Sequence, residues 1–331
     1  MAISASDVAK LRKATLAGMM DCKKALEEAD GNFDKAVEII RKKGQAVANK
    51  RADRDATEGV TIAKTNDDNT FGALIVLNSE TDFVAKNADF QNLAAKILDI
   101  AIANKPADLN ALKALPMEGA TVAEKVTEYI GIIGEKLDLA AYEKVAAPYV
   151  QAYIHPGNQR TAVVGFNKAG VDVQVYKDIA MQVVSMSPIA IDEPSVPKEV
   201  VDKEFELGLS KTKLELTEKA VQAALTKAGY NLYISENEEH INEGIMKGYI
   251  TEAQADDIRR IKKEVAEEAA ANIPEQKLQN IAKGRINKFF KEKTLVNQEF
   301  WKDSKQTVAQ YLKASDKDLA VTAFQSYDLK Q

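Results

Sequence analysis

The sequence has one cysteine, Cys22, and two histidines, His155 and His240, in 331 residues. One cysteine allows no internal disulfide, and the two histidines lie far apart with no second ligand at the spacing of a metal site. No apolar run approaches the ~20 residues of a membrane helix, and the start shows no charged-then-apolar signal. We therefore expect a cytoplasmic protein without metal or cofactor, acting away from the membrane.

The common catalytic and phosphate-binding motifs are also missing. We find no GxxxxGK[ST] loop, no GxGxxG after a strand, no GxSxG and no CxxC. The net charge of −5 is unlike that of most nucleic-acid binders, which are basic. These absences favour a non-enzymatic binding or regulatory protein that makes no direct contact with nucleic acid.

The composition is that of a folded protein with several parts. Hydrophobic residues make up 45% and charged residues 29%, while 331 residues correspond to two or three units at roughly 100 to 200 residues each. The order of helical and strand patterns along the chain predicts an α+β fold. The expected parts are a three-helix domain (1–45), a linker (46–58), a first core subdomain (59–148), a second core subdomain (149–197 and 294–331) and an inserted helical hairpin (198–293).

The first part reads as three short helices. Ser6 or Asp7 can cap the first, 15–18 form a break, and Asn32 can cap the third. Lys42, Lys43 and Gly44 look like a cationic last turn with a glycine stop, so we expect the third helix to end there. The polar stretch that follows mixes both signs of charge, and we expect it to be a solvated connector.

The core shows one pattern twice. Strands at 60–64 and 71–79 flank the polar turn 66–69, and a helix begins at Asp89 with Phe90 on its apolar face. A strand at 161–166 and a helix with Tyr176 at the matching offset repeat this order. The last segment, 319–328, alternates like a strand and should join the second sheet. We expect two related subdomains with antiparallel sheets.

The insertion at 198–293 carries two apolar stripes separated by Gly229 and Tyr230. Thr251 and Gln254 form a capping-box pattern at the start of the later helix. We expect a protruding antiparallel helical pair of coiled-coil type whose acidic faces stay in water. Its role is open between decoration, self-association and a second contact with a partner.

Several motifs carry a resemblance to a known family. The stretch from Val8 to Gly44, the run LNSETDFVAKN at 77–87, and Lys283-Gly284-Arg285 resemble the elongation factor Ts family, in order along nearly the whole chain. The resemblance implies a ubiquitin-associated-like N-terminal module. It also implies the activity of a guanine-nucleotide exchange factor for elongation factor Tu, a translational GTPase bound in its GDP or nucleotide-free form.

The resemblance also implies which side chains contact the GTPase. Asp82 and Phe83 match the pair that enters beside the magnesium site, with the ring acting as a wedge between two helices. The full set of implied contacts is Met19, Met20, Lys23, Asp82, Phe83, Ile133, Gly134 and His155.

Each implied contact has a simpler structural interpretation. An aromatic residue such as Phe83 is more often buried in a core, although its position between a strand and a helix cap is compatible with exposure. Met19 and Met20 are adjacent, so we expect one in the core and one displayed. Leu16 stands where the family usually has glycine, which should alter the loop before Met19. His155 precedes Pro156-Gly157 and fits a turn.

Two other functions remain open from the sequence. One is a ubiquitin-associated-like adaptor without exchange activity, in which the three-helix domain binds a helix or a sheet edge. The other is an enzyme whose site is assembled from carboxylates.

Overall fold

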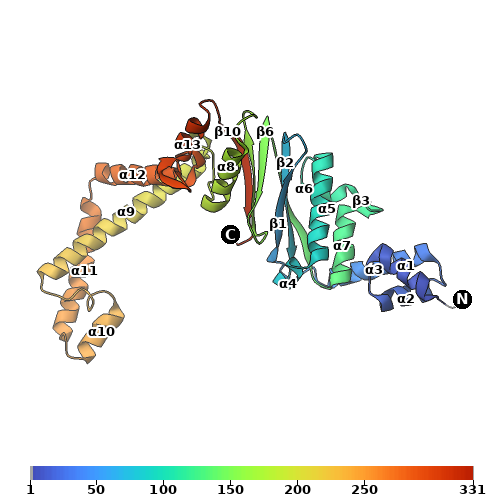
Figure 1. The fold of residues 1–331 in the computed structure, drawn as a ribbon. Helices are drawn as coiled ribbons and strands as arrows, with labels where there is room; N and C mark the ends of the chain where they lie inside the picture. The colour runs from blue at the N-terminus through green and yellow to red at the C-terminus, as the bar shows by residue number, and fades with distance from the viewer. Residues whose placement is uncertain (1–2, 331) are drawn as a thin grey trace. The chain divides into compact units, whose positions relative to one another are not determined.

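The computed structural model describes residues 3–330, and the chain separates into two compact units (Figure 1). Unit 1 comprises Met1–Ile191 and Gln298–Gln331, and unit 2 comprises Asp192–Asn297. Helices and antiparallel sheets together confirm the expected α+β class. Among the described residues, no helix has both the length and the apolar composition needed to cross a membrane.

Unit 1 begins with a bundle of α1 (Ala5–Thr15), α2 (Met19–Glu28) and α3 (Phe33–Lys50). Three helices were expected here, and their core contains Leu11, Cys22 and Leu26. The cap of α1 is Ser4 rather than Ser6 or Asp7. The Ser4 side chain accepts a hydrogen bond from the Asp7 amide and the Asp7 carboxylate accepts one from the Ser4 amide, so Asp7 takes the N3 position of a capping box.

The prediction that the third helix ends at Gly44 is wrong, because α3 continues through this glycine to Lys50. Gly44 is buried against α7 (Val122–Ile133), where the atoms nearest to a Cβ built on it belong to Thr127, Glu128 and Gly131. Gly44 therefore lies in a helix–helix contact, where Gly131 of α7 is the residue that has no room for a Cβ. A glycine in such a contact looks the same in sequence as one that ends a helix.

The first sheet has the order β1-β2-β5, all antiparallel, from β1 (Glu58–Thr65), β2 (Phe71–Ser79) and β5 (Leu137–Ala146). The predicted turn at 66–69 joins β1 to β2. One face of the sheet is covered by α5 (Ala88–Asn104) and α7, with Phe90, Leu93 and Ile97 of α5 fully buried. The cap of α5 is Asn87, two residues before the Asp89 that we expected to begin the helix. The remaining elements between β2 and β5 are α4 (Asp82–Ala85), α5 (Ala88–Asn104), α6 (Leu109–Ala114), β3 (Pro116–Met117) and β4 (Ala120–Thr121).

The second sheet has the order β10-β7-β6, from β6 (Tyr149–Ile154), β7 (Arg160–Phe166) and β10 (Val321–Asp328). As expected, the last strand returns to this sheet. α8 (Val173–Met186) covers its outer face with Tyr176, which stacks on Tyr149 at a centroid distance of 3.9 Å. Along the chain, three elements follow unit 2 and precede β10: β8 (Glu299–Phe300), β9 (Asp303–Thr307) and α13 (Val308–Ser315).

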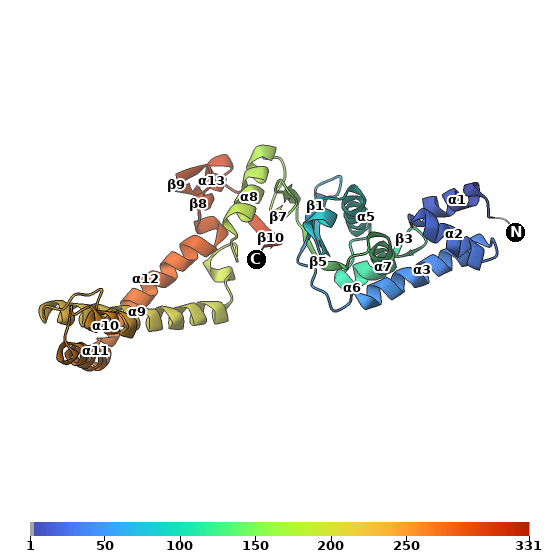
Figure 2. The same cartoon turned by 90° about the horizontal axis from the view of Figure 1, so that it is seen from below.

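The two sheets pack face to face, with α5 and α7 on one side and α8 on the other (Figure 2). The hydroxyl groups of Thr61 and Thr161 lie 2.6 Å apart between the sheets. A Cβ built on Gly72 would come within 2.7 Å of the Val150 side chain, so this glycine allows the close approach. The sandwich forms a rigid frame that fixes the loops at its ends.

Unit 2 is helical. Its longest element, α9 (Lys198–Lys227), packs against both α11 (Glu252–Asn272) and α12 (Glu275–Lys293), and α10 (Glu238–Met246) lies between α9 and α11 in sequence. The predicted capping box of Thr251 and Gln254 is confirmed. Instead of the expected single pair there are four helices: α10 is a further short helix, and Pro274, the N-cap of α12, separates α12 from α11. Single 3-10 turns, Glu193–Ser195 and Leu295–Asn297, flank the helices.

Candidate functional site

Two loops meet at one end of the first sheet. Ser79, the last residue of β2, pairs with Leu137, the first residue of β5. Because the two strands are antiparallel, the segment after β2 and the segment before β5 must emerge side by side. The first segment contains Asp82 and Phe83, and the second contains Gly134, so the sheet register brings three of the expected contact residues to the same end.

Reciprocal hydrogen bonds lock these loops together. The Glu80 carboxylate accepts a bond of 2.6 Å from the Lys136 amide, and the Glu135 carboxylate accepts bonds from the Thr81 amide at 3.1 Å and from the Thr81 hydroxyl at 2.9 Å. Each loop thus supplies the acceptor for an amide of the other. Backbone groups that would otherwise be left free are satisfied, and the loops hold a defined geometry.

Glu80 also binds the segment that we expected to be a solvated connector. Arg51 and Arg54 donate to its two oxygens at 2.8 and 2.9 Å, and the Lys136 ammonium donates to the carbonyls of Ala52 and Arg54 at 2.7 Å each. Burial alone would raise the pKa of Glu80, but the Lys136 amide and the two guanidinium groups outweigh it and lower the pKa to about 2. The connector is therefore fixed on the core beside the loops.

Phe83 lies on this fixed frame but points into solvent. Thr81 caps the four-residue helix α4 by accepting a hydrogen bond from the Val84 amide, and Phe83 is the second residue of that helix. Its side chain is 81% exposed. The neighbouring Asp82 accepts a bond of 2.6 Å from Lys86, which holds the pKa of Asp82 below its usual range. An exposed aromatic ring on a rigid support is typical of an interface anchor.

A hollow of about 800 Å³ separates Phe83 from the N-terminal helices. Leu16 and Met19, at the junction of α1 and α2, line one side. Phe83 and Ile133, from α4 and the end of α7, line the other. The hollow also contacts Arg12 and Lys13 on the first side and Asp89 on the second. Three expected contact residues, Met19, Phe83 and Ile133, therefore face one space although they lie far apart in sequence.

The two adjacent methionines differ from our expectation. Met19 is 56% exposed and Met20 is 64% exposed, so neither is in the core. The buried face of α2 is already filled by Cys22, Ala25 and Leu26. Met20 does not line the hollow, and neither does Lys23, which pairs with Glu27 at 3.8 Å.

Gly134 and His155 lie outside the hollow as well. Gly134 ends α7 with φ 80°, a left-handed conformation that suits glycine, and its amide donates to the Ile130 carbonyl. His155 is exposed in the turn after β6, with its Nδ1 3.2 Å from the Tyr153 hydroxyl. The carbonyl of Asn158 in that turn accepts a bond of 2.7 Å from the Thr61 amide, which ties the turn to β1.

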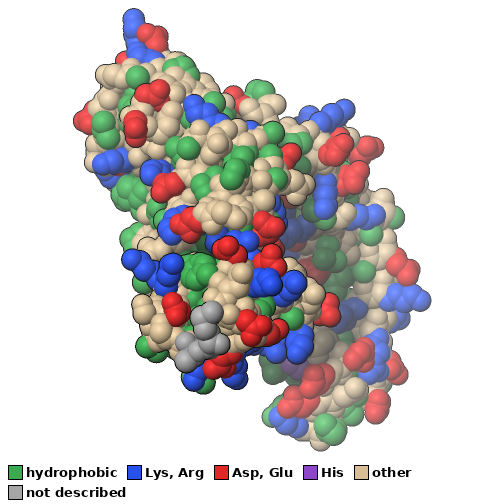
Figure 3. Space-filling model, turned by 90° about the vertical axis from the view of Figure 1, so that its right-hand side faces the viewer, with side chains coloured by type: hydrophobic (Ala, Val, Ile, Leu, Met, Phe, Trp, Pro, Cys, Tyr) green, Lys and Arg blue, Asp and Glu red, His purple; other side chains and the backbone are tan. Residues whose placement is uncertain are grey.

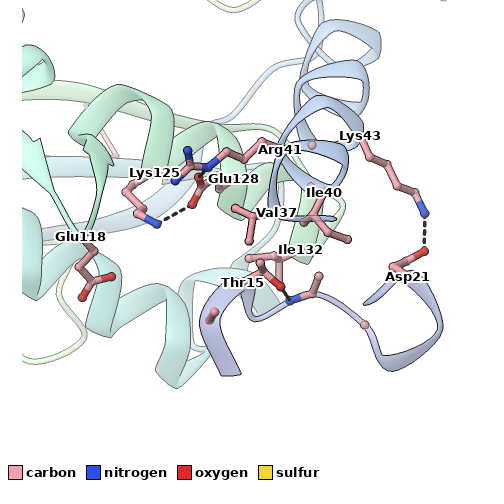
Figure 4. A pocket seen from close by; sticks show the side chains of 15 residues that line it. Thr15, Asp21, Val37, Ile40, Arg41, Lys43, Glu118, Lys125, Glu128 and Ile132 are labelled. Atoms are coloured by element: carbon pink, nitrogen blue, oxygen red, sulfur yellow. Dashed lines mark hydrogen bonds and ion pairs between the residues drawn. The ribbon is translucent and has the colours of Figure 1, made fainter. Parts of the chain in front are cut away.

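The positions of the two walls depend on how α3 packs against α7 (Figure 4). Beside their crossing lies a cavity of about 330 Å³, lined by residues of the bundle and of α7. Glu128 of α7 lies between two cations, with Arg41 of α3 at 2.7 Å and Lys125 at 2.7 Å. Sequence reasoning missed this contact, although the glycines inside both helices, Gly44 and Gly131, were a usable signal of close packing.

The surface of this region carries both signs of charge. On the face shown in Figure 3, Lys and Arg side chains are interspersed with Asp and Glu side chains. Near the hollow, the cations Arg12 and Lys13 belong to α1 and the anion Asp89 belongs to α5. The two sides of the hollow therefore carry side chains of opposite charge.

Comparisons with known proteins agree with the motifs. The family model described as "Elongation factor TS" matches residues 80–331. "Elongation factor Ts" of Bacteroides fragilis is 49% identical over 331 residues, covering 100% of this chain and 99% of the relative. The proteins of that name from Amoebophilus asiaticus and Porphyromonas gingivalis are 42% and 40% identical, covering 98% and 99% of both chains respectively. With a family match over most of its length and relatives this similar from end to end, the chain belongs to the elongation factor Ts family.

Proposed function

We propose that this protein is the guanine-nucleotide exchange factor of elongation factor Tu and promotes GDP release in translation elongation through protein contacts alone. Membership of the family supports this function. The structural observation that carries the mechanism is Phe83, which is 81% exposed on loops fixed by Glu80 and Glu135. The protein would act in the cytoplasm, where translation takes place, without binding nucleic acid or membrane itself and without catalysing a covalent reaction.

The exchange mechanism requires only that the phosphate and magnesium site of the GTPase be disturbed. A GTPase holds its nucleotide through a phosphate-binding loop and Mg²⁺, whose octahedral coordination tolerates little displacement. We place Phe83 between two helices of the GTPase and Asp82 beside its magnesium site. By thermodynamic linkage, if a partner weakens the binding of the nucleotide, the nucleotide must weaken the binding of that partner by the same factor.

The hollow suits a helix of the GTPase as its occupant. Exposed apolar side chains on both sides, Leu16 and Met19 opposite Phe83 and Ile133, match the recognition of an amphipathic helix in a groove. Arg12 and Lys13 on one side and Asp89 on the other would set its orientation by charge. Met19 is an adaptable anchor, because methionine fits irregular surfaces.

The remaining contacts would extend the interface beyond the hollow. Met20 and Lys23 lie on the exposed surface of α2, and Gly134 lets the backbone turn beside Phe83. His155 is displayed by a turn tied to β1, whose first residue pairs with the last residue of β2. We propose that these positions contact the GTPase over a broad surface, so that binding energy accumulates away from the wedge.

In the alternative, an adaptor without exchange activity, the three-helix domain binds a helix or a sheet edge and the wedge has no role. Family membership favours the exchange factor. Under the adaptor function, the partner would bind and its nucleotide would stay in place. The two functions therefore differ in one measurable quantity, the rate of nucleotide release at saturating protein.

The test is stopped-flow release of fluorescent GDP from purified elongation factor Tu. The expected result is a release rate that rises with protein concentration, together with dissociation of the complex by excess GDP and Mg²⁺. Binding in sedimentation with an unchanged release rate would establish the adaptor instead. Absence of both binding and acceleration would refute both functions.

A further inference from the structure

One end of unit 2 exposes large apolar side chains around its short helix α10. The core beneath them is complete without them, with Leu225, Ile241 and Ile258 nearly or fully buried. We call residues 231–252 the tyrosine end of unit 2. Its large apolar side chains between 43% and 82% exposed are Leu232, Tyr233, Met246 and Tyr249. Such a concentration on a small helical unit marks an interaction surface.

The two tyrosines line one hollow of about 480 Å³, although one precedes α10 in the chain and the other follows it. Gly244 of α10 also lines this hollow. A Cβ built on Gly244 would come within 2.9 Å of the Ile234 side chain and 3.3 Å of the Ile250 side chain, so α10 packs closely on the segments before and after it. The hollow is therefore shaped by the packing of the tyrosine end itself.

The segment before α10 holds Tyr233 in place. The Tyr233 ring stacks on the His240 ring at a centroid distance of 4.2 Å with an interplanar angle of 25°. The His240 Nδ1 lies 2.9 Å from the Tyr233 carbonyl oxygen. The Lys262 ammonium of α11 donates to the Ser235 and Glu236 carbonyls at 2.8 and 2.9 Å. Both the ring and the backbone of this segment are therefore fixed before any partner binds.

The turn that ends α10 holds Tyr249. Gly248 has φ 71°, a left-handed conformation that suits glycine. The Tyr249 amide donates to the Gly244 carbonyl at 2.9 Å, and the Gly248 amide donates to the Ile245 carbonyl at 3.0 Å. These two bonds form a Schellman motif, which sets the direction of the chain after the helix. A partner that binds two tyrosines on fixed backbones loses little entropy in ordering them.

The tyrosine end is strongly acidic. Residues 231–252 contain five glutamates and one lysine, Lys247. Lys247 is already paired with Glu243 in the wall of the hollow, and this pair lowers the pKa of Glu243. Glu239 and Glu252 are exposed and form no ion pair within the described part of the chain. The end therefore carries negative charge that the protein itself does not neutralise.

Aromatic rings beside free carboxylates select the chemistry of the partner. The glutamates repel phosphate groups, so nucleic acids and anionic lipids are disfavoured as occupants. The same charges attract a cationic polypeptide. Arginine suits this surface best, because its guanidinium group stacks on aromatic rings and also forms paired hydrogen bonds with carboxylates.

We propose that the tyrosine end of unit 2 binds an extended, arginine- and lysine-rich segment of a separate protein. One arginine side chain of that segment enters the hollow and stacks on Tyr249. His240 already covers one face of Tyr233, so Tyr233 serves as a fixed wall of the hollow. The hollow thus recognises one cationic side chain mainly through aromatic contact.

The rest of the bound segment lies outside the hollow. Its other cations pair with Glu239 and Glu252, whose carboxylates have no ion pair among residues 3–330. Its apolar side chains cover Leu232 and Met246, which are exposed in the free protein. This contact lies on unit 2 and does not rest on the exchange function, whose hollow beside Phe83 belongs to unit 1.

The first experiment measures binding of a defined probe to the full-length protein by fluorescence anisotropy. The probe is a labelled peptide of sequence GRLRKLRG, and the control peptide carries glutamate in place of each arginine and lysine. The expected result is saturable binding of the basic peptide that weakens as salt rises, and no binding of the acidic peptide. Tyr249→Ala should weaken binding by about tenfold or more, as expected for loss of an aromatic anchor. Tyr249→Phe keeps the ring and should bind the basic peptide as wild type does.

The second experiment separates this surface from general attraction to an acidic protein. Glu239→Gln with Glu252→Gln should weaken binding of the basic peptide by about threefold or more and reduce its dependence on salt. Glu199→Gln with Glu206→Gln removes the same charge from exposed positions at the start of α9, away from α10 (Figure 1), and should leave binding nearly unchanged. Leu214→Ala removes an exposed apolar side chain elsewhere in unit 2 and should also bind as wild type does. Circular dichroism of each variant checks that its helices are intact.

Several results would overturn the proposal. One is a basic peptide that does not bind, or that binds no better than the acidic one. Another is unchanged affinity in folded Tyr249→Ala, or an equal loss of affinity in the two glutamine pairs, since either would place the contact elsewhere. If Tyr249→Ala abolished a dimer of the wild-type protein in sedimentation, the occupant would instead be a second copy of this chain.

Nucleotide exchange on elongation factor Tu is measured in parallel with the same variants. Tyr249→Ala should retain the wild-type rate of GDP release. A slower release with folded Tyr249→Ala would overturn the proposal, because the tyrosine end would then be a further contact with the GTPase. Loss of peptide binding with normal exchange, and normal peptide binding without exchange, are distinct results, so this proposal and the exchange function can fail separately.

Discussion

A Cβ atom built on Gly131 would lie 2.5 Å from the Cα atom of Gly44. The two helices that carry these glycines, α3 and α7, therefore cross more closely than a side chain at position 131 would allow. Their contact attaches the N-terminal bundle to the core and so fixes the distance between Met19 and Phe83 across the hollow. The geometry of the proposed interface depends on two residues that do not touch the partner.

The contact is asymmetric, which gives a matched pair of variants. Gly131→Ala should force α3 away from α7, lower the free energy of unfolding by about 1 to 3 kcal/mol and raise the KM for elongation factor Tu in exchange. In Gly44→Ala, the added Cβ would meet its nearest atoms at 3.6 Å or more, an ordinary contact. This variant should have the same free energy of unfolding as wild type, or one higher by up to about 1 kcal/mol, because alanine favours the helix more than glycine does. Equal effects of the two changes in urea unfolding would contradict this packing.

Leu16 is a second position where the backbone geometry decides the outcome. Its φ of 55° lies in the left-handed region, and its side chain is 50% exposed. Any residue with a Cβ pays about 1 to 2 kcal/mol in this conformation, whereas glycine does not. We expect Leu16→Gly to be more stable to urea than Leu16→Ala by about 1 kcal/mol, since both remove the side chain and only one relieves the backbone. Equal stabilities would show that the loop relaxes in the alanine variant.

Several features could be predicted because they depend on residues close in sequence. The apolar stripes around Phe90 and Tyr176 follow from helical spacing, and the turn at 66–69 follows from turn chemistry. The capping box of Thr251 and Gln254 is likewise local. A local pattern can also fit two structures. Gly44 fits both the end of a helix and a contact between helices, and only the position of the distant helix α7 distinguishes them.

The assembly of the site could not be predicted from the residues alone. Met19 and Phe83 come together through the crossing of α3 and α7, which no local pattern encodes. Arg51 and Arg54 read as solvated charges because their acceptor, Glu80, lies across a chain reversal. The family resemblance indicated that Phe83 is a contact residue. The structure explains why its ring is exposed to solvent, because the core beneath α4 is filled by other side chains.

The carboxylate of Glu80 should give a defined pH dependence. Its pKa of about 2 is below the ordinary value near 4.5, so the folded protein prefers the charged form. The resulting stability is complete above about pH 4.5 and is lost as the pH falls toward 2. Glu80→Gln should therefore be less stable than wild type at neutral pH, with the difference shrinking in acid. Urea unfolding across this range measures it.

Glu143→Gln is the matched control for this change, because Glu143 is exposed on β5. It should show little difference from wild type at any pH. A difference between Glu80→Gln and wild type that stays constant from neutral pH to acid would show that the carboxylate is not held charged by Arg51, Arg54 and the Lys136 amide.

The exchange mechanism itself is decided by comparing Phe83 with Phe90. Phe83 is 81% exposed and Phe90 is fully buried against the first sheet. Phe83→Ala should leave thermal unfolding nearly unchanged, because it removes no packed side chain. It should slow GDP release from elongation factor Tu by roughly thirtyfold, which corresponds to the loss of an interface anchor of about 2 kcal/mol. Phe90→Ala should instead destabilise the fold by about 3 to 5 kcal/mol and leave exchange per folded molecule intact. Elongation factor Tu could instead release GDP as fast with saturating Phe83→Ala as with saturating wild-type protein. The ring would then not act as a wedge, and the exchange activity would have to come from the hollow and the surfaces around it.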